Sequence, residues 1–189
     1  MTCRTTGYAM LMSASPQEAM DLGAVAHLSA IHSRYAFMHC FDGFRTSHEM
    51  QRIEALDYED LRGLVDWEAL QAFRRQCLNP EHPTNRGNNV NPDIYFQCKE
   101  GVNETTAALP DTVQHYMDEI NQLTGRNYQL FNYYGAEDAE EVIVVMCSAS
   151  EAVKETVDYL NQQGRKVGLL QVHLYRPFPA EHFLAAVPK

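Results

Sequence analysis

The sequence predicts an α/β fold built from parallel-sheet βαβ units. The chain begins with an apolar strand, a helix and a second apolar strand, and it ends with another succession of the same kind. Short joins between such segments are typical of parallel strands connected by crossover helices. With 45% hydrophobic and 21% charged residues among 189, the composition is that of a soluble globular protein.

The first unit occupies the N-terminal 41 residues. Residues 7–13 (GYAMLMS) form a short apolar run that predicts a buried strand. The motif SPQE at 15–18 combines a capping serine, a first-turn proline and a glutamate, which together predict the start of a helix over 16–33. The run YAFMHCF at 35–41 predicts a second buried strand.

The middle of the chain lacks the regular alternation of strands and helices. Residues 54–78 have helical spacing and predict two helices broken near Gly63–Asp66. The stretch 79–93 is rich in proline and asparagine and predicts a turn-rich loop. A short strand is expected over 94–100 (IYFQCKE), followed by an amphipathic helix over 109–125 with a proline at its start and a glycine at its C-cap.

The α/β pattern returns near the C-terminus. The β-branched run 140–148 (EEVIVVMCS) predicts a strand buried on both faces. Ser148 and Glu151 suggest a second capping box, and Gly164 ends the helix that follows. A strand over 165–175 comes next, and a last helix follows a proline at 179. The second unit begins near residue 136, which predicts a domain boundary around 132–137.

Charge and cysteine usage exclude several classes of function. A net charge of -10, with no basic cluster longer than Arg74-Arg75, argues against nucleic-acid binding and against an anionic membrane surface. No stretch has the roughly 18–20 apolar residues that cross a bilayer, and no signal-peptide pattern is evident, so the expected compartment is the cytoplasm. The five cysteines form no C-x-x-C pair, which makes an iron–sulfur or structural zinc site within the chain improbable.

Common nucleotide, hydrolase and metalloprotease motifs are absent from the sequence. The two strand-to-helix turns at 13–17 and 148–151 offer helix N–H groups that an anion would accept, but simple capping is the favoured interpretation. His27 and His32 are five apart on one helix, a poor spacing for a shared metal. His39, Cys40 and His48 are also rejected as zinc ligands, because adjacent strand residues point to opposite faces.

The segment FDGFRTSHE (41–49) is the densest group of polar side chains. It follows a predicted parallel strand, at the sheet edge where α/β proteins bind ligands. Arg45 suits a carboxylate or phosphate, and His48 titrates near neutral pH. An interdomain seam held by an Arg45–Asp42 or Arg45–Glu49 ion pair explains the same residues, and this interpretation is favoured.

Several irregular loop strings carry a family resemblance. FDGFRTSHE, LNPEHP, NPDIYFQ, LTGR, YYGAEDAEEVIV and LYRPF together resemble pyruvate:ferredoxin (flavodoxin) oxidoreductases, over essentially all 189 residues. The resemblance implies that residues 1–133 are the C-terminal part of a pyrimidine-binding domain, with a helical and loop extension. Residues 134–189 would then begin a domain similar to the C-terminal domain of transketolase.

The resemblance also implies a function for the longer protein. Family members oxidise pyruvate to acetyl-CoA with thiamine diphosphate, Mg²⁺ and [4Fe-4S] clusters, and they pass electrons to ferredoxin or flavodoxin, as homodimers. The family's catalytic, cofactor and metal residues match no position in this sequence, so none is assigned. Cysteines stand where the family pattern has other residues, at Cys40, Cys98 and Cys147.

The expected role of this chain is therefore indirect. Asp42, Arg45 and His48 are predicted to brace the exit from the pyrimidine domain and to line an approach to the active site, without bond-making chemistry. The chain alone is expected to be inactive and to oligomerise or dissolve poorly. The alternative is a non-catalytic interaction module or subunit of a split or truncated oxidoreductase.

Overall fold

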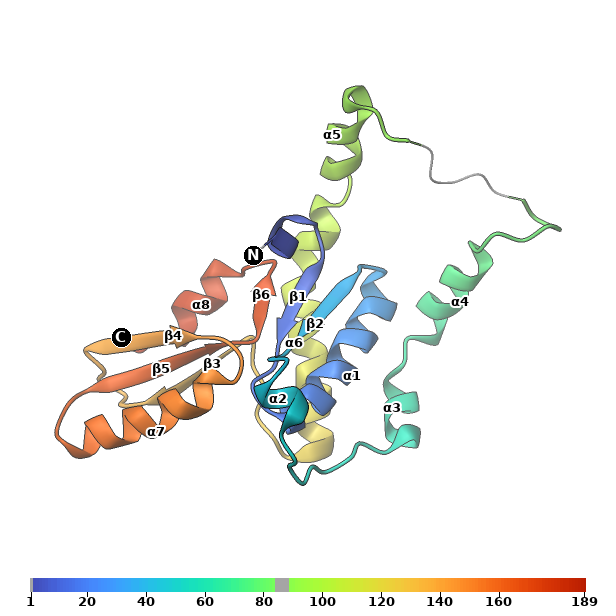
Figure 1. The fold of residues 1–189 in the computed structure, drawn as a ribbon. Helices are drawn as coiled ribbons and strands as arrows, with labels where there is room; N and C mark the ends of the chain where they lie inside the picture. The colour runs from blue at the N-terminus through green and yellow to red at the C-terminus, as the bar shows by residue number, and fades with distance from the viewer. Residues whose placement is uncertain (1, 84–88) are drawn as a thin grey trace.

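The computed structural model describes residues 2–83 and 89–189, and the predicted loop at 79–93 lies partly outside the described residues. Two small sheets lie side by side, the helices of residues 58–75 pack against the first long helix and the core, and the helix of residues 92–100 projects from the body (Figure 1). In chain order the elements are a 3-10 helix (Thr2–Thr5), β1 (Ala9–Met12), α1 (Pro16–Ser33), β2 (Phe37–Cys40), α2 (Arg45–His48), α3 (Tyr58–Leu64), α4 (Trp67–Arg75), α5 (Pro92–Glu100), α6 (Asn103–Thr124), β3 (Phe131–Gly135), β4 (Glu141–Val145), α7 (Ala149–Gln162), β5 (Val167–Val172), β6 (Leu174–Arg176) and α8 (Ala180–Ala186).

Both predicted βαβ units are confirmed. In the first sheet, of order β2-β1-β6, β1 and β2 are parallel and joined by α1. In the second sheet, of order β3-β5-β4, β4 and β5 are parallel and joined by α7. Each sheet also gains an antiparallel strand, β6 beside β1 and β3 beside β5, so both sheets are mixed.

The predicted strand over 165–175 divides between the two sheets. Its first part, β5, is buried throughout and forms the centre of the second sheet. After His173 the chain enters β6, which pairs with β1 in the first sheet. The C-terminal third of the chain therefore completes the sheet that the N-terminal third begins.

A single core joins these parts. The first helix, α1, packs against α6, and the largest cluster of buried residues draws on both helices and both sheets. Its fully buried members include Leu22 from α1, Met117 from α6, Leu170 from β5 and Leu174 from β6. Because Leu22 and Met117 belong to the first predicted domain and Leu170 and Leu174 to the second, the two predicted domains share apolar burial.

The prediction of a strand over 94–100 is wrong. These residues lie in α5, which has Pro92 at its first turn and Asp93 beside it. Both residues favour a helix start, since a first-turn proline loses no hydrogen bond and an acidic residue complements the helix dipole. The β-branched and aromatic run Ile94–Phe96 misled the prediction, and in the structure these three side chains are exposed.

The start of the next helix was also misplaced. The long helix α6 begins at Asn103, and Pro110 lies inside it rather than at its first turn. Leu109, Pro110 and Val113 are buried on the helix face that packs on the core, which offsets the hydrogen bond that the proline removes. The predicted C-cap is confirmed, since Gly125 adopts a left-handed conformation with φ of 71°.

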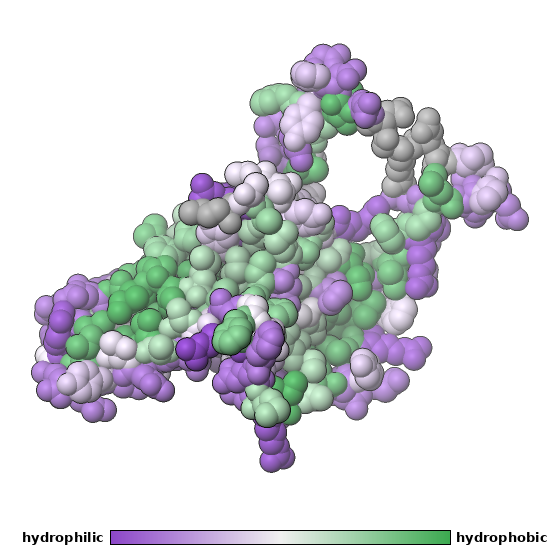
Figure 2. Space-filling model, viewed as in Figure 1, coloured by the Kyte–Doolittle hydropathy of each residue, from purple (hydrophilic) through white to green (hydrophobic). Residues whose placement is uncertain are grey.

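The prediction that residues 140–148 are buried on both faces is wrong for this chain. The strand β4 is shorter than predicted and lies at the edge of its sheet. Val144 is 53% exposed, and Ile143 and Met146 are also exposed. Hydrophobic side chains are visible over this part of the surface in Figure 2.

Within the described residues, no helix is both long enough and apolar enough to cross a membrane.

Candidate functional site

Polar side chains from distant segments meet where β1 and β2 end. We call this region the junction; it comprises residues 13–18 after β1, residues 41–49 after β2, residues 147–151 at the start of α7, and residues 171–173 between β5 and β6. The carboxyl ends of parallel strands are the usual ligand-binding edge of an α/β sheet. The predicted site residues Asp42, Arg45 and His48 all lie in this junction.

Asp42 caps the N-terminus of α7. One of its carboxylate oxygens, Oδ2, accepts a hydrogen bond of 2.6 Å from the backbone N–H of Ser148. The predicted capping box at Ser148 is wrong, because Ser148 has helical backbone angles and its side chain makes no cap hydrogen bond. A carboxylate at a helix N-terminus satisfies an otherwise unpaired donor and complements the helix dipole. Asp42 thus joins segments that lie 106 residues apart.

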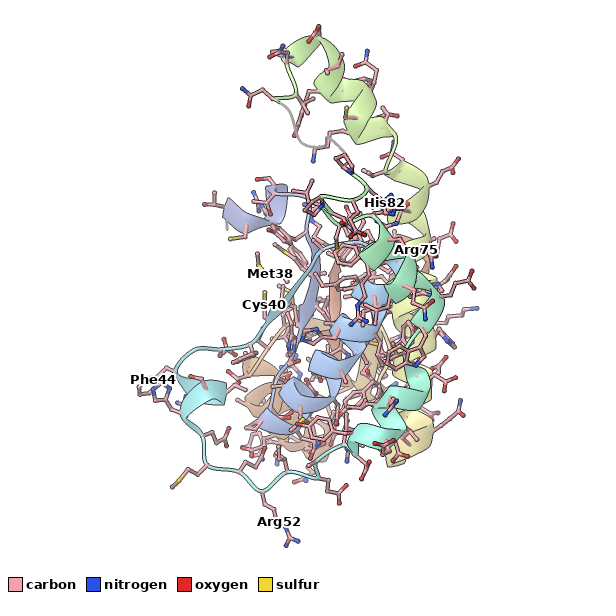
Figure 3. The ribbon with its side chains drawn as sticks, turned by 90° about the vertical axis from the view of Figure 1, so that its right-hand side faces the viewer. Met38, Cys40, Phe44, Arg52, Arg75 and His82 are labelled. Carbon is pink, nitrogen blue, oxygen red and sulfur yellow. The ribbon has the colours of Figure 1, made fainter. Side chains whose placement is uncertain are left out.

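Arg45 and His48 lie on the exposed side of the same loop, in α2. Among residues 2–83 and 89–189, no ion pair joins Arg45 to Asp42 or Glu49, so the pairing that the seam interpretation assumed is not formed. His48 Nδ1 lies 3.0 Å from the carbonyl oxygen of Gly43, and its ring stacks on Phe44, which is 80% exposed. Figure 3 shows Phe44 at the tip of this loop, pointing away from the body.

A buried threonine holds this loop in place. Thr46 is 5% exposed, and its Oγ1 donates a hydrogen bond of 3.3 Å to the carbonyl oxygen of Ala14, in the turn after β1. The prediction passed over Thr46 because a single threonine in a polar stretch gives no signal of burial. The loop is therefore anchored by Thr46 and Asp42.

Glu18 forms a second link across the junction. Its carboxylate accepts hydrogen bonds from the Ala14 N–H at 2.6 Å and from Gln171 Nε2 at 3.0 Å, and His173 Nε2 lies 3.6 Å away. Burial pushes the pKa of Glu18 up, but His173 and the donated hydrogen bonds outweigh it and hold the pKa below its ordinary value. Glu18 was predicted only as part of a capping box; its partners Gln171 and His173 were not predicted.

The two buried partners of Glu18 are themselves oriented. Gln171 Nε2 also lies 2.9 Å from His173 Nε2, and His173 Nδ1 lies 2.7 Å from the carbonyl oxygen of Gln129. Both ring nitrogens of His173 are thus fixed by neighbouring groups of the chain. Glu18, Tyr128, Gln171 and His173 line a cavity of about 170 Å³, whose other walls come from β3, β5 and α7 of the second unit.

Asp21 lies at the centre of a third polar group. Its carboxylate is fully buried and lies 2.7 Å from Arg126 Nε, while the Tyr128 hydroxyl donates to it at 2.7 Å and Gln17 Nε2 at 3.1 Å. Burial, followed by the hydrogen bond to Asp21, raises the pKa of Tyr128 far above its ordinary value. Arg126 also reaches the exposed carboxylate of Glu54 at 2.9 Å. The group fixes the end of α6 against α1.

The histidines and cysteines considered as metal ligands have other partners in the structure. His39 Nε2 lies 2.7 Å from Ser13 Oγ, and His32 pairs with Asp66 at 2.8 Å. Within the described residues, no group of three or more His, Cys, Asp or Glu side chains is placed to hold a metal ion. All five thiols are free, and burial, followed by the nearby Asp42 carboxylate, raises the pKa of Cys147 to about 11.

The comparison with known proteins identifies the family. A family model described as pyruvate flavodoxin/ferredoxin oxidoreductase, thiamine diphosphate-binding, matches residues 1–118. The chain belongs to this family. A second model, the pyruvate:ferredoxin oxidoreductase core domain II, matches residues 139–188. The resemblance seen in the loop strings is confirmed.

Curated relatives agree with both matches. The pyruvate:ferredoxin oxidoreductase of Moorella thermoacetica is 56% identical over 188 residues, and the pyruvate-flavodoxin oxidoreductase of Klebsiella pneumoniae is 57% identical over 189. The pyruvate dehydrogenase [NADP(+)] of Cryptosporidium parvum is 44% identical over 190 residues. Each match covers 100% of this chain, but the chain spans only 16% of the first two relatives and 10% of the third.

The junction does not fit thiamine diphosphate. Two of its carboxylates, Asp42 and Glu18, are bonded to Ser148 and to Ala14 and Gln171, and Asp21 beside it is paired with Arg126. A diphosphate needs free donors and a metal cradle, and the N–H groups of Ala14, Glu18 and Ser148 already donate to protein oxygens. No cofactor contact is therefore assigned to these residues.

Proposed function

We propose that this chain is the junction segment of a pyruvate:ferredoxin or pyruvate:flavodoxin oxidoreductase. The longer protein would oxidise pyruvate to acetyl-CoA and reduce ferredoxin or flavodoxin. One observation carries the proposal: 56–57% identity to the Moorella and Klebsiella enzymes along the whole chain, irregular loops included. Such identity across surface loops indicates shared neighbours as well as a shared fold.

The role proposed for the chain's own residues is to hold two domains in register. The proposed boundary, with residues 1–133 on one side and 134–189 on the other, falls between the two family matches. Three kinds of contact cross it: the Asp42–Ser148 hydrogen bond, the Glu18–Gln171 hydrogen bond and the pairing of β1 with β6. A shift of one domain against the other would break all three.

Arg45 and His48 keep the role proposed from the sequence, that of lining an approach to the active site. Their exposure and their position beyond the carboxyl end of β2 support this role. Asp42 has a positioning role, because its carboxylate is committed to α7. Arg45→Ala should therefore weaken assembly or substrate binding more than it slows the chemical step.

Cofactors and partners follow the family. Thiamine diphosphate, Mg²⁺ and [4Fe-4S] clusters would be held by residues of the longer protein that this chain does not contain. Pyruvate, coenzyme A and ferredoxin or flavodoxin would be its substrates, in a cytoplasmic homodimer. None of these assignments needs a reactive group among the residues described.

A chimera tests the proposal. The 189 residues replace the matching segment of the Moorella enzyme, and CoA-dependent pyruvate oxidation is measured with ferredoxin as acceptor. We expect activity within about tenfold of the parent, equivalent to about 1.4 kcal/mol in the barrier. A chimera that folds, dimerises and binds cofactors but does not oxidise pyruvate would favour the non-catalytic interaction module instead.

Two further measurements complete the test. Asp42→Ala in the chimera should reduce activity together with stability, while Glu49→Ala, in the same loop but without the contact to α7, should leave both unchanged. The 189-residue chain alone should neither bind thiamine diphosphate nor consume pyruvate. Tight binding of that cofactor by the chain alone would contradict the proposal.

A further inference from the structure

A second surface, at the opposite end of the first sheet, has a composition unlike the rest of the chain. It is a groove with two adjoining lobes of about 350 and 320 Å³. The lobes share Gly7, Tyr8 and Tyr35, which lie just before β1 and β2. We call it the basic groove. Its walls come from the N-terminal 3-10 helix, the end of β6, the end of α5 and the start of α6, which gather at the amino end of β1 (Figure 1).

The described residues that line the basic groove are all neutral or cationic. Arg4 and Arg176 line one lobe, and Arg34 and Lys99 line the other. Among residues 2–83 and 89–189, no acidic side chain lines either lobe, although the chain has 25 acidic residues against 15 basic ones. Four of those cations in one groove on a protein of net charge -10 create a local positive field, which attracts anions.

Three of these cations are held without a carboxylate partner in the described part of the chain. Arg34 bonds the Gln76 side-chain oxygen and lies over the Phe73 ring, Lys99 lies over the Tyr95 ring, and Arg176 lies over the Tyr175 ring. The ion pairs that the structure contains involve other residues. Aromatic contacts orient these side chains but leave most of their N–H donors for another acceptor.

The shared floor adds two aromatic faces. The Tyr35 hydroxyl lies 3.4 Å from Thr106 Oγ1, whose own hydrogen is donated to the Val102 carbonyl oxygen at 2.8 Å. Tyr8 is 44% exposed beside it. Gly7 has φ of +94°, and a Cβ at this position would lie 3.7 Å from Lys99 Nζ, so the ammonium group lies close above the floor.

We propose that the basic groove binds a small molecule of the organic diphosphate class. Two lobes with two cations each match two linked phosphoryl groups, and guanidinium forks match phosphate oxygens in a bidentate geometry. The exposed tyrosine faces suit the organic part of such a molecule. The site is separate from the junction, since it lies at the amino ends of β1 and β2 and the junction lies at their carboxyl ends.

Inorganic pyrophosphate is the probe, titrated calorimetrically into the full chain at fixed ionic strength. Inorganic phosphate and succinate are titrated for comparison. We expect pyrophosphate to bind at least about tenfold more tightly than either, because only it reaches both lobes with tetrahedral anions. The double variant Arg34→Gln/Arg176→Gln, which removes one cation from each lobe, should lose about tenfold or more in affinity.

A matched double variant serves as control. Arg45→Gln/Arg52→Gln also removes two exposed arginines, from the other end of the sheet, and should change the affinity less than about twofold. Figure 3 shows Arg52 pointing into solvent there. Lys99→Gln, on the exposed helix α5, repeats the test if the first double variant melts at a lower temperature.

Three results would overturn the proposal: no measurable pyrophosphate binding, equal affinity for pyrophosphate and succinate, or an equal loss in the control variant. The last two would mean that net charge alone attracts the anion. The outcome is independent of the pyruvate chimera, which tests the proposed function.

Discussion

The junction and the arm, which we define as α3, α4 and α5, differ in the burial of their side chains. Glu18 at the junction and the fully buried Asp21 beside it are paired with residues far along the chain. No residue of the arm is fully buried: Leu61 packs partly buried against the core, and Phe73 and Phe96 are exposed. The arm forms helices all the same (Figure 1). Local capping and spacing are thus enough to set a helix, whereas stability and position come from contacts made across the chain.

Among the substitutions considered, the loss of the Asp21 carboxylate should lower the free energy of unfolding most. Asp21→Ala should lower the free energy of unfolding by about 3–5 kcal/mol, because Arg126 and Tyr128 would lose a buried carboxylate. Glu54→Ala, which removes the other and exposed partner of the same arginine, should cost far less. Urea denaturation of both variants measures the difference. Equal losses would mean that burial does not distinguish the two carboxylates.

A leucine pair compares apolar contacts in the two regions. Leu22 is fully buried in α1, and Leu22→Ala should cost about 2–5 kcal/mol through lost contacts and a cavity. Leu78 follows α4 in the arm and is 81% exposed, so Leu78→Ala should change stability by less than about 0.5 kcal/mol. Thermal melting of the two variants provides the measurement. A large effect at Leu78 would show that this side chain is packed in solution.

Two aspartate caps compare the regions at a smaller scale. Asp42→Ala removes the cap of α7 and should lower the free energy of unfolding by about 1–2 kcal/mol. Asp57 caps α3 from within its own segment, accepting from the Glu59 N–H at 2.7 Å. Asp57→Ala should change global unfolding less, since α3 has no fully buried residue and can open locally. Amide hydrogen exchange in α7 and α3 separates the two effects.

The smallest expected effect concerns acid. The pKa of Glu18 is lowered on folding from its ordinary value of 4.5, so its stabilising contribution is complete above about pH 4.5 and is lost as the pH falls below that value toward the folded pKa. Wild type should therefore lose more stability between pH 6 and pH 4 than Glu18→Gln. Unfolding free energies of both proteins at the two pH values test this. Equal pH dependence would contradict the role given to Glu18.

The sequence predicted elements well where the signals were local. The serine cap at Ser15, the C-cap at Gly125 and both βαβ units are present in the structure. Predictions failed where a local signal competed with a tertiary one. Residues 94–96 have strand propensity but follow a helix start, and nothing packs on them to favour a sheet. Ser148 has the residue type of a cap, yet Asp42 takes its place from another segment.

The candidate site was predicted in part. Asp42, Arg45 and His48 do lie together after β2, because one short loop carries them. Their partners could not be predicted, since a hydrogen bond between residues 42 and 148 depends on how two sheets meet. Gln171 and His173 gave no signal either, because isolated polar residues in an apolar run reveal their burial only when the opposing carboxylate is known.

The sequence by itself determined the family, the α/β class and the positions of most helices, since these follow from loop strings, periodicity and caps within a few residues. The tertiary structure alone decided that β6 leaves its neighbours to pair with β1, that Glu18 and Asp42 bridge the junction, and that four cations share one groove. The physical reason is the sequence separation over which each interaction acts. Backbone propensity and capping act over a few residues, whereas burial and charge pairing act between any segments that the fold brings into contact.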